Sequence, residues 1–204
     1  MPGFTLNIAV DELLKKEFDL LRKQGKQHPL QKEYGIEAKP VDHDKLNVWR
    51  YNFKGVEAIH KPTNLRITGA IDDLWQNPDG EYVVLDYKAT SKAGKVTELG
   101  DRPWHDTYRR QLAVYRWLLE KNGLKVSDIG YWVYANGIKT KASFNKKLEF
   151  ELTLISEKID DSWLEPTLIK IKNTLEQDKI PGPNRTCEFC GYIREQSEAF
   201  RAKK

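Results

Sequence analysis

The sequence has few cysteines and no long apolar run. Its two cysteines, Cys187 and Cys190, are separated by only two residues, and this spacing excludes the disulfide framework of small secreted proteins. No apolar stretch approaches the roughly 20 residues that a membrane-spanning helix needs, and no basic segment followed by an apolar run opens the chain as a secretion signal does. We therefore expect a cytoplasmic protein that has no membrane partner.

Aromatic residues, by contrast, are frequent. The 204 residues include six Trp, nine Tyr and seven Phe, and 39% are hydrophobic, whereas disordered chains are poor in such residues. This length fits one domain with one core. The 34 Lys and Arg exceed the 30 Asp and Glu, for a net charge of +4, which permits a nucleic acid partner without requiring one.

Apolar periodicity and turn residues predict the order of the elements. We expect, in this order, helix 9–22, a short helix within 44–52, strand 65–75, a turn at 77–80, strand 82–87, helix 107–122, strand 128–135, a turn at 136–137, strand 149–155 and helix 162–177. This order predicts an α/β (α+β) fold in which helices flank a mixed central sheet. We expect a single domain over residues 1–204, in which residues 181–204 form a C-terminal tail that carries the two cysteines.

A pair of opposite charges ends the apolar strand 82–87. Asp86 and Lys88 are two residues apart and point to the same face of the strand, while Tyr87 points to the other face. If the turn at 77–80 pairs the two strands, Asp72 reaches the same end of the sheet as Asp86. Asp73 then points away from Asp72, and we expect it to be structural.

Two carboxylates and an ammonium group at one sheet end favour phosphodiester chemistry. Carboxylate oxygens suit Mg²⁺ or Mn²⁺ better than zinc, and such an ion polarises a phosphoryl oxygen and activates a bound water. The alternative is that Asp86 and Lys88 form a solvated salt bridge worth at most about 1 kcal/mol. Four apolar residues directly precede Asp86, which is an unusual place for a purely solvated charge.

Three motifs together resemble a known nuclease family. They are Gly69-Ala-Ile-Asp72, Leu85-Asp86-Tyr87-Lys88 and Gln111-Leu-Ala-Val-Tyr115, and in order and spacing they are similar to the RecB-like branch of the PD-(D/E)XK nuclease superfamily, which includes CRISPR-associated RecB-like exonucleases. The resemblance spans about residues 65–119. It implies a restriction-endonuclease-like core and a metal-dependent deoxyribonuclease that acts in DNA repair, recombination or CRISPR adaptation.

The resemblance also assigns roles to individual residues. Asp72 and Asp86 would hold Mg²⁺ or Mn²⁺ together with the backbone carbonyl of Tyr87, and Lys88 would be the catalytic lysine. Gln111 and Tyr115, one helical turn apart, would hold the DNA strand near the metal, although Tyr115 is equally compatible with a core position.

The first helix departs from the pattern of this branch. Its members usually carry the motif Gly-x-x-x-His in this helix. In this chain the corresponding residues are Asn7-Ile-Ala-Val-Asp11, so Asp11 stands in the place of the His. Asp11 can ligate a hard cation as a further side-chain ligand. It can equally be an acidic residue near the helix start, where the helix dipole favours it.

Cys187 and Cys190 have the spacing of metal ligands but form only half of a site. Tetrahedral zinc and [4Fe–4S] clusters usually need four ligands, and related nucleases combine C-terminal cysteines with cysteines before the first helix to hold an iron–sulfur cluster. No cysteine precedes Cys187. Either such a cluster is lost, or a preceding segment supplies its other ligands.

Basic residues lie near the proposed site in the sequence. Lys92, Arg109 and Arg110 flank it and could contact DNA phosphates, and Trp104 in the expected loop could stack on an unpaired base. We expect a DNA partner, as single strands or duplex ends, and exonuclease rather than site-specific cleavage. The alternatives are a nuclease-derived DNA-binding module that no longer cuts and a metal-binding adaptor built on the two cysteines. The oligomeric state is open.

Overall fold

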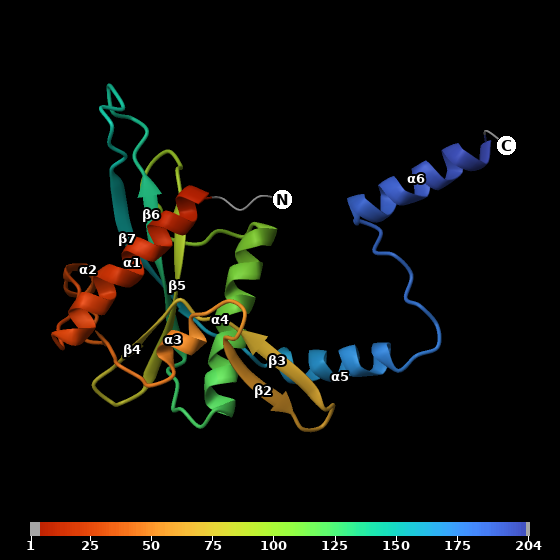
Figure 1. Ribbon diagram of the computed structural model, residues 1–204, viewed down its shortest axis with the longest axis horizontal. Helices are drawn as coiled ribbons and strands as arrows, with labels where there is room; N and C mark the ends of the chain where they lie inside the picture. Colours follow the sequence, from red (N-terminus) through yellow and green to blue (C-terminus); the bar gives the residue numbers. More distant parts are fainter. Residues whose placement is uncertain (1–4, 203–204) are drawn as a thin grey trace.

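The computed structural model describes residues 5–202, which form a five-stranded mixed sheet with helices on both faces (Figure 1). The strand order is β1-β4-β5-β6-β7, with β5 and β6 parallel and the other neighbours antiparallel. The strands are β1 (Lys39–Pro40), β4 (Asp73–Gln76), β5 (Tyr82–Thr90), β6 (Ile129–Gly137) and β7 (Phe150–Lys158). The expected mixed α/β architecture is confirmed.

The remaining elements are a small hairpin and the helices. The hairpin pairs β2 (Val56–His60) with β3 (Leu65–Gly69) as a separate two-stranded sheet. The helices are α1 (Thr5–Lys23), α2 (Pro29–Glu33), α3 (Leu46–Trp49), α4 (Pro103–Lys121), α5 (Leu164–Leu175) and α6 (Glu188–Ala202). No helix within residues 5–202 is both long and apolar enough to cross a membrane.

Strand β5 lies at the centre of the sheet, as its apolar run predicts, and its side chains alternate between two cores. Val84 packs in the cluster that contains Leu112 and Leu118 of α4. Leu85 packs in the cluster that contains Leu14 and Phe18 of α1. Because successive side chains of a strand point to opposite faces, α4 covers the face of β5 that carries Asp86 and Lys88, and α1 covers the other.

The predicted turn at 77–80 joins β4 to β5 and sets their register. The amide of Asn77 donates a 3.0 Å hydrogen bond to the carbonyl of Glu81, and Gly80 has a φ of 76°, which glycine adopts without steric cost. Asp73 pairs with Leu85 and Gln76 with Tyr82.

The prediction of one strand over 65–75 is wrong, because two strands of different sheets share this segment. β3 ends at Gly69 and β4 begins at Asp73, with residues 70–72 between them outside any strand. Gly69 packs so closely on α4 that a Cβ there would lie 3.1 Å from Leu118 Cδ1. The chain therefore leaves the hairpin under α4 and turns into the main sheet.

Two further boundaries differ from expectation. α4 begins at Pro103, so Trp104 lies in its first turn rather than in a loop; proline is favoured at this position because the first helical amide needs no partner. Residues 136–137 are not a turn but the end of β6. The Asn136 side chain accepts a 2.8 Å hydrogen bond from the Lys92 amide and donates one of 2.8 Å to the Gly94 carbonyl, so this asparagine fastens the neighbouring loop.

The expected tail contains a helix. α6 follows α5 after an extended connection, and it lies apart from the sheet and from α1 (Figure 1).

Candidate active site

Asp72 and Asp86 face each other at the end of the β4–β5 pair. Continuing the register beyond Asp73 and Leu85 places Asp72 opposite Asp86. The amide of Tyr87 donates a 2.8 Å hydrogen bond to Asp72 Oδ2, which fixes this carboxylate at the strand end. The juxtaposition expected from the hairpin is therefore present.

Asp86 is buried, and its environment disfavours its negative charge. The residue is 1% exposed, and Lys88 Nζ forms an ion pair with Asp86 Oδ2. Burial and then the negative charge of Asp72 raise the pKa of Asp86 to about 8, while Lys88 opposes this shift. Asp86 Oδ2 is otherwise buried without a hydrogen-bond partner, so it has unused acceptor capacity.

α4 holds Lys88 from the other side. Lys88 Nζ donates a 3.1 Å hydrogen bond to Gln111 Oε1, and Gln111 Nε2 donates a 2.6 Å hydrogen bond to the hydroxyl oxygen of Tyr115. The Lys88 ammonium also lies 4.6 Å from the centre of the Tyr108 ring. Tyr115 is buried, and burial followed by the negative charge of Asp86 raises its pKa, so its hydroxyl stays protonated.

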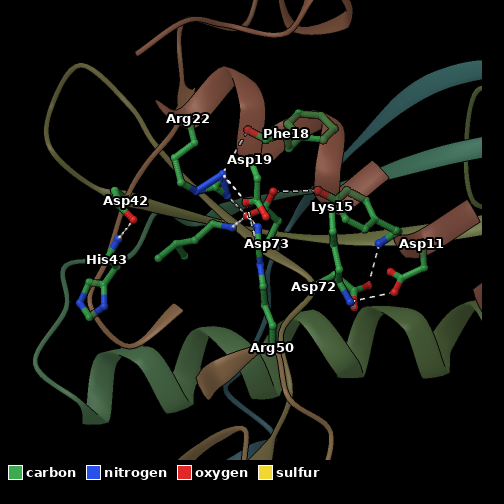
Figure 2. Close-up of polar contacts among 12 residues, drawn as sticks. Asp11, Lys15, Phe18, Asp19, Arg22, Asp42, His43, Arg50, Asp72 and Asp73 are labelled. Atoms are coloured by element: carbon green, nitrogen blue, oxygen red, sulfur yellow. Dashed lines mark hydrogen bonds and ion pairs between the residues drawn. The ribbon is translucent and has the colours of Figure 1, made fainter. Parts of the chain in front are cut away.

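α1 contributes Asp11 and a lysine that the sequence motifs do not include (Figure 2). Lys15 Nζ lies 2.8 Å from Asp11 Oδ2 and 3.4 Å from Asp72 Oδ1. Burial alone would lower the pKa of Lys15, but Asp72 and then Asp11 raise it overall. Burial and the charge of Asp72 raise the pKa of Asp11. The i, i+4 spacing of Asp11 and Lys15 was the available signal, because it places both on one helix face.

Asp73 takes no part in this group and instead forms a buried ion cluster (Figure 2). Its Oδ1 forms ion pairs with Arg22 and Arg50, and its Oδ2 accepts a 2.7 Å hydrogen bond from the Tyr87 hydroxyl. The cluster joins α1, the segment after α3 and β5. This placement agrees with the expected structural role of Asp73.

The donor set suits a hard divalent cation, although its side chains do not form a complete cage. Within residues 5–202, no three or more His, Cys, Asp and Glu side chains form a group that could hold a metal ion. Asp72 and Asp86 nevertheless offer adjacent carboxylates, and the buried Oδ2 of Asp86 has no hydrogen-bond partner apart from its ion pair with Lys88. Two carboxylates completed by backbone oxygen and water match the preference of Mg²⁺ and Mn²⁺.

Of the residues predicted to contact DNA, Trp104 lies on the same face of α4 as Gln111, whereas Arg109 and Arg110 do not. Trp104 is 47% exposed and lies two helical turns before Gln111, so both share one face of α4. Arg109 and Arg110 lie off that face. Arg109 contacts Glu157 at 3.3 Å and donates a 3.2 Å hydrogen bond to the Leu99 carbonyl, which engages its guanidinium within the fold.

A small cleft opens beside the catalytic lysine candidate. Its volume is about 200 Å³, and residues from α1, β5 and α4 line it, including Asn7, Asp11, Lys88 and Tyr108. The exposed Lys92 lies beyond the end of β5, and its ammonium is 6.0 Å from the centre of the Tyr134 ring.

The two cysteines are adjacent in space as well as in sequence. The Sγ atoms of Cys187 and Cys190 are 2.7 Å apart, and the Cys190 amide donates to Cys187 Sγ at 3.2 Å. Hydrogen bonds from the Cys190 thiol and amide lower the pKa of Cys187. Within residues 5–202, no group of three or more His, Cys, Asp and Glu side chains that could hold a metal ion includes this pair.

Comparison with known families agrees with this geometry. The model of the PD-(D/E)XK nuclease superfamily matches residues 7–194, a range that includes Asp11, Asp72, Asp86, Lys88 and Gln111. No curated protein and no solved structure matches the chain.

Proposed function

Because the chain belongs to the PD-(D/E)XK nuclease superfamily, we propose that it is a metal-dependent deoxyribonuclease of the RecB-like type. Membership implies a nuclease that acts on nucleic acid, and the mixed sheet with helices on both faces is consistent with a restriction-endonuclease-like fold. The observation that carries the finer proposal is the position of Lys88. Its ammonium group lies between the buried carboxylate of Asp86 and the amide oxygen of Gln111.

Asp72 and Asp86 would hold Mg²⁺ or Mn²⁺, with the Tyr87 carbonyl as a third ligand and Asp11 as a further one. When bound, the ion supplies Lewis-acid polarisation of the phosphoryl oxygen and lowers the pKa of a bound water. Burial and the charge of Asp72 raise the pKa of Asp86, and a cation bound beside the two carboxylates would favour the charged form of Asp86 instead.

The protein's own groups orient the reactants. Lys88 is fixed by Gln111 at 3.1 Å, so its ammonium can position the attacking water and offset the charge that develops on the phosphate. Gln111 in turn donates to Tyr115 at 2.6 Å, and this pair would align the DNA strand. Trp104, on the same face of α4 and exposed, would stack on an unpaired base.

These features favour a nuclease that acts on single strands or duplex ends. Trp104 offers a stacking surface that accepts any base, and we infer exonuclease cleavage of DNA ends, in repair, recombination or CRISPR adaptation. Exposed Lys92 and Arg110 would contribute phosphate contacts whose strength falls with salt.

The test uses labelled single-stranded DNA, linear duplex, closed circular duplex and RNA, each with Mg²⁺, Mn²⁺ or EDTA. We expect cleavage of single strands and linear duplex with either cation, none in EDTA and none of the closed circle. Asp86→Asn and Lys88→Ala should abolish cleavage with circular dichroism unchanged, and Lys170→Ala, an exposed position on α5, is the matched control. Cleavage retained in both site variants would overturn the assignment.

A second candidate function applies if the protein binds DNA but does not cleave it. The chain would then be a nuclease-derived DNA-binding module, and the parent protein would shift DNA in a gel without cutting it under any cation. The presence of Asp72, Asp86 and Lys88 in contact favours the enzyme, because binding alone does not need a buried carboxylate paired with a lysine. An adaptor built on Cys187 and Cys190 would instead hold stoichiometric metal and bind no DNA.

A further inference from the structure

The turn between α3 and β2 exposes two aromatic rings to solvent (Figure 1). Tyr51 and Phe53 are 51% and 88% exposed, and their ring centroids lie 5.6 Å apart. Neither side chain belongs to either hydrophobic core. Exposed apolar side chains that occur together, rather than singly, indicate an interaction surface. We call residues 51–55 the aromatic turn.

The backbone of the aromatic turn is firmly held although its side chains are exposed. The carbonyl of Tyr51 accepts hydrogen bonds from the amides of Lys54 at 2.9 Å and Gly55 at 2.8 Å. Gly55 has a φ of 67°, and it packs so closely on Gly69 that a Cβ would lie 2.5 Å from the Gly69 carbonyl oxygen, so the position favours glycine. The two rings are therefore presented on an ordered support, which lowers the entropic cost of binding a ligand.

A further hydrogen bond places the aromatic turn beside the candidate active site. The amide of Ile71, which directly precedes Asp72, donates a 3.1 Å hydrogen bond to the carbonyl of Trp49. The chain reaches Tyr51 two residues after Trp49. Because consecutive Cα atoms are about 3.8 Å apart, the aromatic turn begins close to the carboxylate that we expect to hold the metal.

Helix α4 shows that the aromatic turn and Trp104 lie on opposite sides of the site. Trp104 precedes Gln111 by seven residues. Leu118 follows Gln111 by seven residues and packs on Gly69, the residue against which the aromatic turn is held. At 1.5 Å per residue, each interval is about 10 Å long. A DNA strand that crosses the site along α4 would therefore meet Trp104 on one side and the aromatic turn on the other.

A groove with basic side chains continues from the aromatic turn. Its volume is about 570 Å³, and its charged lining residues are Lys45, Lys54, Arg66 and Glu57. Arg66 lies 3.7 Å from Glu57. Lys45 and Lys54 are exposed, and within residues 5–202 neither forms an ion pair. Two such ammonium groups beside exposed rings suit a nucleic acid strand, because phosphates pair with the cations while bases stack on the rings.

We propose that the aromatic turn and this groove bind the DNA strand on the side of the active site opposite to Trp104. Bases would stack on Tyr51 and Phe53, and phosphates would lie beside Lys45 and Lys54. This inference rests on the proposed nuclease function and specifies its substrate. Stacking does not read sequence, since every base offers a face to a ring. The preferred substrate is therefore an unpaired strand of any sequence that is long enough to reach both sides of the site.

Fluorescence anisotropy in EDTA with a labelled oligothymidine of about 12 nucleotides tests the proposal without cleavage. We expect Phe53→Leu to raise the dissociation constant by roughly tenfold and Phe53→Trp to keep it within about twofold, because the ring rather than its apolarity is required. Phe144→Ala, which removes an exposed ring between β6 and β7, is the matched control and should have no effect. Combining Phe53→Leu with Trp104→Ala should multiply the two losses, because the two rings bind separate parts of the strand.

The two lysines are tested by the salt dependence of the same binding. Lys45→Ala/Lys54→Ala should flatten the plot of log affinity against log salt by about 0.7 for each lost phosphate contact. Lys26→Ala/Lys32→Ala, at exposed positions after α1 and in α2, is the matched control and should leave the slope unchanged.

The outcomes separate this proposal from the nuclease function. If the parent protein binds and cleaves DNA but Phe53→Leu binds equally well, the nuclease function stands and the proposal is overturned, with the aromatic turn then a contact for another protein. An unchanged salt slope in the lysine variant would overturn the assignment of the groove. A parent protein that neither binds nor cleaves DNA would overturn both the nuclease function and the proposal.

Discussion

The Tyr87 hydroxyl donates a 2.7 Å hydrogen bond to Asp73 Oδ2, on the face of the sheet opposite to Lys88. Asp73 is fully buried and also pairs with Arg22 and Arg50. Two adjacent aspartates thus have separate tasks: Asp72 belongs to the candidate active site, and Asp73 joins α1 to the sheet.

Substitutions at Asp72 and Asp73 should affect cleavage and stability separately. Asp73→Ala leaves two buried guanidinium groups without their shared partner, so we expect the free energy of unfolding to fall by about 3–5 kcal/mol. Urea unfolding followed by circular dichroism measures this. Tyr87→Phe removes one hydrogen bond and should cost about 1–3 kcal/mol. Asp72→Ala, at a half-buried position, should change unfolding much less while abolishing cleavage; equal destabilisation at positions 72 and 73 would contradict the division.

Lys15 should behave as a cation that a bound metal replaces. The Lys15 ammonium lies 3.4 Å from Asp72 and 2.8 Å from Asp11, so Lys15→Met leaves two carboxylates without this positive charge. We expect the free energy of unfolding in EDTA to fall by about 1 kcal/mol. Saturating Mn²⁺ should raise the melting temperature of this variant more than that of the parent protein. The exposed Lys26→Met is the control, and identical shifts in all three proteins would argue against metal binding by these carboxylates.

Trp104 should contribute to binding of single strands. Its side chain is exposed on the face of α4 that carries Gln111, and stacking on a base is worth about 1–3 kcal/mol. We expect Trp104→Ala to weaken binding of fluorescent single-stranded DNA in EDTA by this amount and Trp104→Phe to retain most of it. Phe144→Ala removes a ring that is 73% exposed in the loop between β6 and β7 and should have no effect; equal losses at positions 104 and 144 would point to non-specific adhesion.

Glu165 should give stability a pH dependence in the acid range. Hydrogen bonds from the indole of Trp117 and the ammonium of Lys121 lower its pKa to about 2, and His60 adds to the shift. The pKa of Glu165 in the folded protein lies below the unfolded value of 4.5. The contribution of Glu165 to the free energy of unfolding is therefore complete above pH 4.5 and is lost as the pH falls toward 2. The carboxylate is 45% exposed, so the effect should stay within about 1 kcal/mol.

Unfolding of the parent protein and of Glu165→Gln between pH 3 and pH 7 measures this contribution as a difference. The two curves should converge as the pH falls. A constant difference over the whole range would show that the carboxylate does not titrate with folding. The same comparison reports on the attachment of the β2–β3 hairpin to α5, because His60 Nε2 lies 2.6 Å from Glu165 Oε2.

Local signals in the sequence predict much of the sheet and which residues of the candidate site lie together. The turn at 77–80 predicts the β4–β5 pair, and the side-chain alternation around Tyr87 correctly assigns Asp86 and Lys88 to one face. The break between β3 and β4 escapes such reasoning, because it involves contacts with distant segments. Gly69 packs closely on α4, and the amide of Ile71 donates a 3.1 Å hydrogen bond to the carbonyl of Trp49. Asn136 is similar: its turn-like sequence is overridden by hydrogen bonds to a loop 42 and 44 residues away.

Contributions from distant segments explain the other differences. Lys15 reaches Asp72 only because α1 packs on the sheet, a contact between residues 57 positions apart that no motif spacing encodes. Arg22 and Arg50 look like surface charges in the sequence, and only the burial of Asp73 reveals their role. The α6 helix lacks a distinct start signal because Cys187 occupies the position directly before Glu188, where a capping residue would be expected.

The pairing of Asp73 with two arginines has a consequence for how the chain folds. A strand that slips by one residue turns every side chain to the opposite face, and a slip of β4 in one direction would bring Leu74 into the place of Asp73. Because Arg22 and Arg50 pair with Asp73 on the α1 side of the sheet, this slip would leave both guanidinium groups without their shared anion. The two arginines therefore disfavour this misaligned register, and they help to keep Asp72 beside Asp86 although neither forms an ion pair with Asp72.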